Sequence, residues 1–187
     1  MNIFDLPSNG GAFVFGQPWG TADLTATFAG PVLTLGAAPI PTSDGFWYVS
    51  GTGGPGEAGN KNMEANMYVE PAGSLPGQLV TFTGNVLSNS LVDPYTSVAF
   101  VKDYAPDFSS FNQVTAPLTP GPFSISLATI NDPSRHVQYG FQTVGPNVWP
   151  TDVTSKGFVN VTAIPEPAAL SLAGVAMIGC MAFRRRR

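Results

Sequence analysis

The sequence predicts an all-β protein, an antiparallel β-sandwich of the jelly-roll type, followed by a single C-terminal transmembrane helix. Three observations lead to this fold class. The 187 residues include 21 Gly and 18 Pro, a composition that disfavours long helices within a folded domain. Apolar and polar residues alternate over several short segments, as in strands with one buried face. Turn-forming pairs such as Asp44-Gly45 and Asp132-Pro133 stand between these segments.

The predicted strands follow the alternation along the chain. In residues 63–69 the odd positions are apolar and the even positions are mostly polar. About nine short strands are expected, at residues 12–15, 22–28, 46–50, 63–69, 80–86, 97–102, 123–127, 137–141 and 158–162. Strands that each carry one polar face predict two antiparallel sheets packed against each other.

These strands make up one predicted domain, residues 1–162. Within it, the Gly-rich residues 51–59 are expected to form a flexible loop that separates the first strands from the main sandwich. Residues 51–56 formally match the dinucleotide-binding pattern G-x-G-x-x-G. Pro55 and Gly59 disfavour the helix whose N-terminus would hold a pyrophosphate, so a loop without a cofactor is the interpretation.

An apolar run, residues 168–183, lies near the end of the chain. It contains no charge, and Ser171 is its only strongly polar residue. As a helix it would span about 24 Å, less than the ~30 Å of a hydrocarbon core, so a buried core helix is an alternative. Pro167 suits the first turn of a helix, and four arginines follow directly. Such a cluster cannot enter a core but can lie among lipid headgroups, which favours a transmembrane helix.

Three tail features stand in a fixed order: the tripeptide Pro165, Glu166 and Pro167, the apolar run 168–183, and the cluster Arg184, Arg185, Arg186 and Arg187. Residues 163–187 closely resemble the PEP-CTERM sorting signal of Gram-negative and related environmental bacteria. The resemblance implies export through the general secretion machinery and transient anchoring in the inner membrane with the C-terminus cytoplasmic. It also implies processing by exosortase and transfer to the cell surface or extracellular matrix. A simple membrane anchor is the alternative.

The first residues do not have the pattern of an export signal. Residues 1–7 contain no basic residue, and residues 7–11 interrupt any apolar stretch with Pro and Gly. Because an exported domain requires such a signal, we expect that the true start lies upstream or that the chain is a fragment, with an unusual signal or insertion by the tail alone as the alternatives.

Charge and cysteine content exclude two classes of function. The eight basic residues include the terminal arginine cluster and the twelve acidic residues include Glu166, so the domain keeps four basic and eleven acidic residues, a formal charge of −7. This field would repel nucleic acid. Cys180, the only cysteine, lies in the predicted membrane helix, where it is interpreted as a small apolar residue, with lipidation or a role in processing as the alternatives. No disulfide, metal or cofactor is expected.

No set of residues predicts catalysis. His136, the single histidine, is expected to be a solvent-facing turn residue, and no G-x-S-x-G elbow accompanies it. Asp103 and Asp107 are expected in a loop, where they form turns, with calcium binding and catalysis as alternatives. Glu64 and Glu70 share a strand face but lie about 20 Å apart along an extended strand, too far to flank one glycosidic bond.

Aromatic residues are the better binding candidates. Trp47, Tyr48, Tyr104 and Trp149 are candidates for stacking on sugar rings, with core packing as the alternative for each. Residues 78–159 resemble galactose-binding-like and carbohydrate-binding-module sandwiches in strand pattern alone. The prediction is an exported surface or matrix protein, not an enzyme, that associates with exopolysaccharide. An extracellular glycan-active enzyme on a jelly roll is the alternative.

Overall fold

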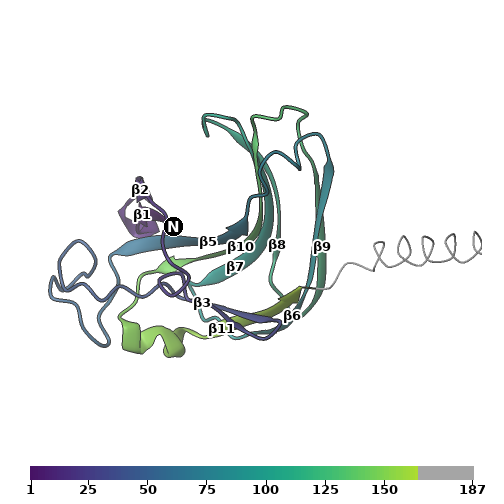
Figure 1. The fold of residues 1–187 in the computed structure, drawn as a ribbon. Coiled ribbons are helices and arrows are strands. Elements are labelled where there is room, and N and C mark those ends of the chain that lie inside the picture. Colours follow the sequence, from purple (N-terminus) through teal and green to yellow (C-terminus); the bar gives the residue numbers. More distant parts are fainter. Residues whose placement is uncertain (164–187) are drawn as a thin grey trace, which may run out of the picture.

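A computed structural model describes residues 1–163 of the chain, which form two antiparallel β-sheets (Figure 1). Sheet A has the strand order β2-β1-β5-β10-β7-β8 and sheet B the order β3-β4-β11-β6-β9. The elements are β1 (Asn2–Asp5), η1 (Pro7–Asn9), β2 (Phe13–Gly16), β3 (Ala26–Ala29), β4 (Val32–Gly36), β5 (Lys61–Val69), β6 (Leu79–Asn89), β7 (Thr96–Tyr104), β8 (Phe111–Pro117), β9 (Gly121–Ala128), β10 (His136–Pro146), η2 (Pro150–Lys156) and β11 (Phe158–Ala163). The predicted all-β class and two-sheet arrangement are confirmed.

The core lies between the sheets and is built by the alternation seen in the sequence. Met63 and Ala65 of β5 are buried and join a cluster with residues of sheet B such as Val159. Aromatic side chains fill the same layer. The ring of Phe82 in β6 lies 5.4 Å from the ring of Phe123 and 5.2 Å from the ring of Phe141, between centroids. Burying an aromatic side chain of this size contributes roughly 1.5–3 kcal/mol to folding.

One expected strand, residues 46–50, is a series of turns instead. The Asp44 side-chain oxygen Oδ1 accepts hydrogen bonds from the backbone N–H groups of Phe46 and Trp47, each at 3.0 Å. The Asp44 carbonyl oxygen accepts a third from the N–H of Tyr48. Hydrogen bonds of this kind offer the backbone an alternative to a strand ladder, and the Asp-Gly pair favours the turn.

Three strands were not expected from the sequence. β1 and β4 are short, and β8 lies at the edge of sheet A with mostly exposed side chains, so none shows a long alternating pattern. Of the expected segment 22–28, only the end belongs to β3. The strands before residues 51–59 extend both sheets, since β1 and β2 lie in sheet A and β3 and β4 in sheet B.

The strands of sheet A bend, so that its outer face, which points away from sheet B, is concave (Figure 1). Gly140 in β10 pairs with Tyr68 of β5 on one side and with Phe100 of β7 on the other. A Cβ atom at Gly140 would lie 2.1 Å from the carbonyl oxygen of Met67, so only glycine permits this close approach. Ala99 and Val101 of β7 face the core between the sheets, so Phe100 between them points to the outer face. Phe100 is nevertheless fully buried, which shows that side chains pack over it on that face.

Within residues 1–163, none of the helices has the length and apolar character needed to cross a membrane. The predicted transmembrane helix, residues 168–183, lies outside the described residues. The tripeptide Pro165 to Pro167 and the cluster Arg184 to Arg187 also lie outside them.

Candidate functional site

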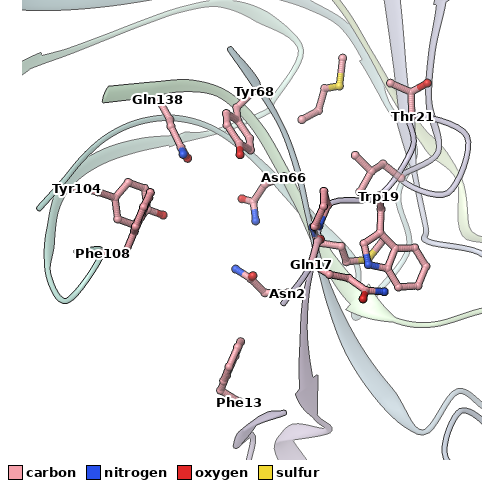
Figure 2. A pocket seen from close by; sticks show the side chains of 14 residues that line it. Asn2, Phe13, Gln17, Trp19, Thr21, Asn66, Tyr68, Tyr104, Phe108 and Gln138 are labelled. Carbon is pink, nitrogen blue, oxygen red and sulfur yellow. Dashed lines mark hydrogen bonds between the residues drawn. The ribbon is translucent and has the colours of Figure 1, made fainter. Parts of the chain in front are cut away.

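The outer face of sheet A holds a hollow of about 660 Å³. Its lining combines side-chain amides with aromatic rings, and Figure 2 shows them facing a common space. In that view Asn2 and Asn66 lie in the middle, Tyr104 and Phe108 on one side, and Trp19 on the other. A hollow with flat apolar walls and a few convergent polar groups is the usual form of a small-molecule binding site.

Strand pairing places the polar residues in a row that crosses the sheet. Asn2 comes from β1, Asn66 from β5, Gln138 from β10 and Tyr104 from β7, which are neighbouring strands in that order. None of the four pairs with the next, since Asn2 pairs with Glu64, Asn66 with Gln142 and Gln138 with Lys102, so the row runs obliquely to the strands. The site therefore extends obliquely across the strands.

A chain of side-chain hydrogen bonds orients the amides at one end of this row. Asn2 and Asn66 each donate a side-chain N–H to Oε1 of Glu64, both at 2.9 Å. Gln142 in turn donates Nε2–H to Oδ1 of Asn66 at 2.9 Å. Because these bonds hold the amides in one orientation, the remaining donors and acceptors of Asn2 are presented to the hollow at little entropic cost.

A second carboxylate organises the other end. Glu70 accepts a hydrogen bond from Nε2 of Gln138 at 2.7 Å and contacts Nδ1 of His136 at 2.7 Å. The His136 ring stacks on Phe108, with centroids 4.3 Å apart and planes 21° apart. His136 is therefore not the solvent-facing turn residue expected from the sequence. It begins β10 and supports the wall of the hollow.

Phe108 is held in an unfavourable backbone conformation at the rim. Its φ angle is +58°, in the left-handed region that bulky residues rarely adopt, and its side chain is 53% exposed. Asp107 fixes the turn, because its Oδ1 accepts hydrogen bonds from the backbone N–H of Ser109 at 3.0 Å and from its hydroxyl at 2.6 Å. The same hydrogen bonds lower the pKa of Asp107. Strain that displays an exposed ring beside a hollow points to a binding role.

Asp103 is not in a loop, because β7 continues to Tyr104. Its carboxylate is fully buried and accepts a hydrogen bond from Nε of Arg135 at 2.6 Å. The other carboxylate oxygen accepts the backbone N–H of Ile130 at 2.8 Å. Both oxygens are engaged in these contacts, so the expected turn role of Asp103 is wrong and its role is structural. Among residues 1–163, no group of three or more acidic, His or Cys side chains is placed to hold a metal ion.

Two ionisable groups on this face have shifted pKa values. Burial raises the pKa of Tyr104 to about 12, and the negative charges of Glu64 and Glu70 act in the same direction. The phenol is therefore a hydrogen-bond donor at every ordinary pH. Burial also lowers the pKa of Lys102, and Glu64 partly offsets this. The Lys102 ammonium lies 4.6 Å from the ring centroid of Phe100.

The structure does not bring the four predicted stacking residues together. Tyr104 lines the hollow. Tyr48 is fully buried and donates its hydroxyl to the carbonyl oxygen of Ile40, so its ring offers no face to a ligand. Trp149 packs against Tyr48, with ring centroids 5.7 Å apart. Trp47 belongs to a separate group of rings and contacts the hollow only through its neighbour Trp19.

Sequence reasoning missed most of the residues that line the hollow. The alternation in residues 63–69 already placed Asn66 and Tyr68 on the polar face of β5, opposite Met63, and could have indicated them. Neither Asn2 nor Phe108 carries such a signal. Asn2 enters the site through pairing of β1 with β5, and Phe108 through the turn between β7 and β8.

Comparison with known proteins identifies the end of the chain and nothing in front of it. No curated protein and no solved structure matches, so the resemblance to galactose-binding-like sandwiches stays a prediction. Residues 163–187 match the family described as the PEP-CTERM protein-sorting motif. The matched stretch contains the tripeptide Pro165 to Pro167 and the cluster Arg184 to Arg187. The chain thus carries, over residues 163–187, the PEP-CTERM sorting motif of secreted, cell-surface-directed proteins that exosortase processes.

Proposed function

We propose that this protein is displayed at the cell surface or in the extracellular matrix after exosortase processing and there binds exopolysaccharide without catalysis. The observation that carries the binding role is the hollow on sheet A, which places four side-chain amides beside aromatic rings. The sorting motif supports the destination, because it directs the domain to the compartment in which exopolysaccharide is found.

The strand order supports a jelly-roll sandwich as the scaffold. From β4 to β11, each strand lies in the opposite sheet from the strand before it in the chain, except that β7 and β8 both lie in sheet A. Eight strands connected in this way form two four-stranded layers, as in jelly rolls. The concave outer face of one layer supplies a long, shallow surface, which suits a polymer better than a small molecule.

The roles of the carboxylates support binding rather than hydrolysis. Glu64 holds the amides of Asn2 and Asn66, and Glu70 holds Gln138 and His136. Each carboxylate therefore acts on a binding side chain. Incubation of the full chain with exopolysaccharide tests this: no release of reducing ends is expected. Steady release that Glu64→Gln or Glu70→Gln abolishes would instead establish the glycan-active enzyme.

Sorting is tested by expressing the full chain in hosts with and without exosortase and measuring intact mass in each cell fraction. Only the host with exosortase is expected to yield a surface or medium form that lacks residues beyond the tripeptide. Glu166→Ala is expected to leave unprocessed precursor in the membrane fraction. The control Asp152→Asn, which removes an acidic side chain from the folded domain, should be processed normally. Full-length protein in the membrane of both hosts would support a simple anchor.

A further inference from the structure

The charges around the hollow on sheet A bear on which polysaccharides can bind there. The inference drawn from them rests on the proposed function. We infer that its ligand is a neutral polysaccharide segment lying obliquely across the strands, and that polysaccharides carrying carboxylate or sulfate groups are rejected. Three features of the described residues carry this inference: the carboxylates behind the amides, the engagement of the basic side chains, and the mixed hydrogen-bonding character of the lining.

Negative charge is built into the hollow at both ends of the polar row. Glu64 lies behind Asn2 and Asn66, and Glu70 lies behind Gln138. Both carboxylates also raise the pKa of Tyr104, which lines the hollow. An anionic group bound beside either carboxylate would meet a like charge in a partly desolvated site, where repulsion is stronger than in bulk water.

The basic side chains that the structure describes compensate for these charges only in part, because Lys102 alone among them interacts electrostatically with Glu64. Lys61 is paired with Asp5 at 2.9 Å, and Arg135 is paired with Asp103. Lys102 is only 5% exposed, and its ammonium lies against the Phe100 ring. Among residues 1–163, the remaining positive groups are the Met1 amino group, which donates to the carbonyl oxygen of Gln17 at 2.9 Å, and Lys156, which lines a different cavity beside η2.

The polar groups that remain available both donate and accept hydrogen bonds. Within the described part of the chain, neither the side-chain amide of Gln17 nor the hydroxyl of Tyr104 takes part in a hydrogen bond. Amides and phenols of this kind match sugar hydroxyl groups, which also donate and accept. A site built for carboxylate or phosphate would present Arg or Lys instead.

The length of the site indicates a segment of polymer. Tyr104 and Phe108, with ring centroids 5.5 Å apart, stand on one side of the hollow, Trp19 stands on the opposite side, and Phe13 lies below Asn2 (Figure 2). Between them the polar row runs obliquely over four neighbouring strands. Aromatic walls at both ends would stack on separate sugar rings, with the amides contacting the hydroxyl groups between them.

The test compares one polymer in two charge states. The full chain, kept in solution with a zwitterionic detergent that has no sugar headgroup, is titrated with neutral glucan, mannan and galactan oligomers. It is also titrated with the same oligomers oxidised at C6 to uronic acids. A neutral oligomer is expected to bind, and its oxidised form to bind about tenfold more weakly at low salt, with the gap narrowing as salt screens the repulsion.

Matched variants locate the effect. Phe108→Ala is expected to weaken binding of the neutral oligomer about three- to tenfold. Phe28→Ala, which removes a comparably exposed phenylalanine from sheet B, is expected to leave it unchanged. The double variant Glu64→Gln with Glu70→Gln is expected to raise the affinity for the oxidised oligomer, because glutamine keeps the acceptor oxygen and removes the charge.

The outcomes separate this inference from the proposed function. Equal or tighter binding of an oxidised oligomer would overturn the inference and leave exopolysaccharide binding in place. Retention of the native exopolysaccharide by the full chain, without binding of any neutral oligomer, would overturn the inference alone. If the full chain neither retains the native exopolysaccharide nor binds any oligomer, the inference and the proposed binding function are both wrong.

Discussion

At the scale of single residues, Asp103 shows how a buried charge can connect distant segments. It lies near the end of β7 and contacts Arg135 and the backbone of Ile130, both in the connection between β9 and β10. A second hydrogen bond joins Nη2 of Arg135 to the Asp103 carbonyl oxygen at 2.9 Å. The pair therefore fixes the connection that leads into His136 and the hollow.

Removing one partner of this pair should destabilise the fold strongly. Arg135→Met leaves the Asp103 carboxylate buried without its counterion, and we expect a loss of about 3–5 kcal/mol in the free energy of unfolding. Urea denaturation measures the loss. Asp107→Asn is the control, since it changes an exposed turn residue whose hydrogen bonds asparagine can also accept. Equal stability of the two variants would contradict the structural role of the pair.

Stability should also fall at alkaline pH because of buried tyrosines. Burial raises the pKa of Tyr95 from 10.0 to about 12, and its hydroxyl donates to the carbonyl oxygen of Pro146 at 3.0 Å. The folded state holds this proton more tightly than the unfolded state. The contribution to stability is therefore complete below about pH 10 and is lost as pH rises toward 12. Urea midpoints measured from pH 8 to 12 should decline less steeply for Tyr95→Phe than for the unaltered chain, and identical slopes would refute this.

At the scale of elements, β5 carries two surfaces on one strand. Met63 and Ala65 face the core, and Asn66 and Tyr68 face the hollow. The period of two in the sequence was enough to predict this strand and its two faces. The same reasoning failed at residues 46–50, where the Asp44 side chain bonds the backbone locally and prevents a strand. An alternating pattern predicts a paired strand only where no nearby side chain forms hydrogen bonds with the backbone in place of the strand ladder.

The bend of sheet A should depend on Gly140. In Gly140→Ala the new Cβ would lie 2.1 Å from the Met67 carbonyl oxygen, a backbone atom that cannot rotate away. We expect a loss of about 1–3 kcal/mol in stability from this overpacking, together with weaker ligand binding as β5 and β10 separate. Gly45→Ala is the control, because its Cβ would have only an ordinary contact at 3.7 Å. Thermal unfolding that is the same for both variants would rule out this constraint.

At the scale of the whole molecule, the last described strand closes the fold. β11 lies inside sheet B, between β4 and β6, and its Val159 and Val161 are buried in the core. The chain from Met1 to Gly157 therefore lacks a central strand until the final segment pairs. The sorting motif begins where this strand ends, so the signal follows directly on the completed sandwich.

This arrangement predicts a sharp effect of truncation. A chain ending at Ala163 should unfold in a single cooperative transition, because both sheets are complete. A chain ending at Gly157 lacks β11. It should fail to fold, because the loss of β11 leaves β4 and β6 with unpaired edges and exposes the core between them. Circular dichroism melting of the two products measures this. Cooperative unfolding of the shorter chain would show that β11 is dispensable.

The sequence by itself determined the fold class and the sorting motif, because both are encoded locally. Alternation within single strands and a contiguous tail can be recognised without knowing what pairs with what. Only the tertiary structure decided the hollow, and of the predicted stacking residues only Tyr104 lines it. Asn2, Asn66 and Gln138 are far apart in sequence and meet because of strand register, in which a slip of one residue would turn each side chain to the opposite face. Register depends on contacts across the whole sandwich, and so the site could not be predicted from any one segment.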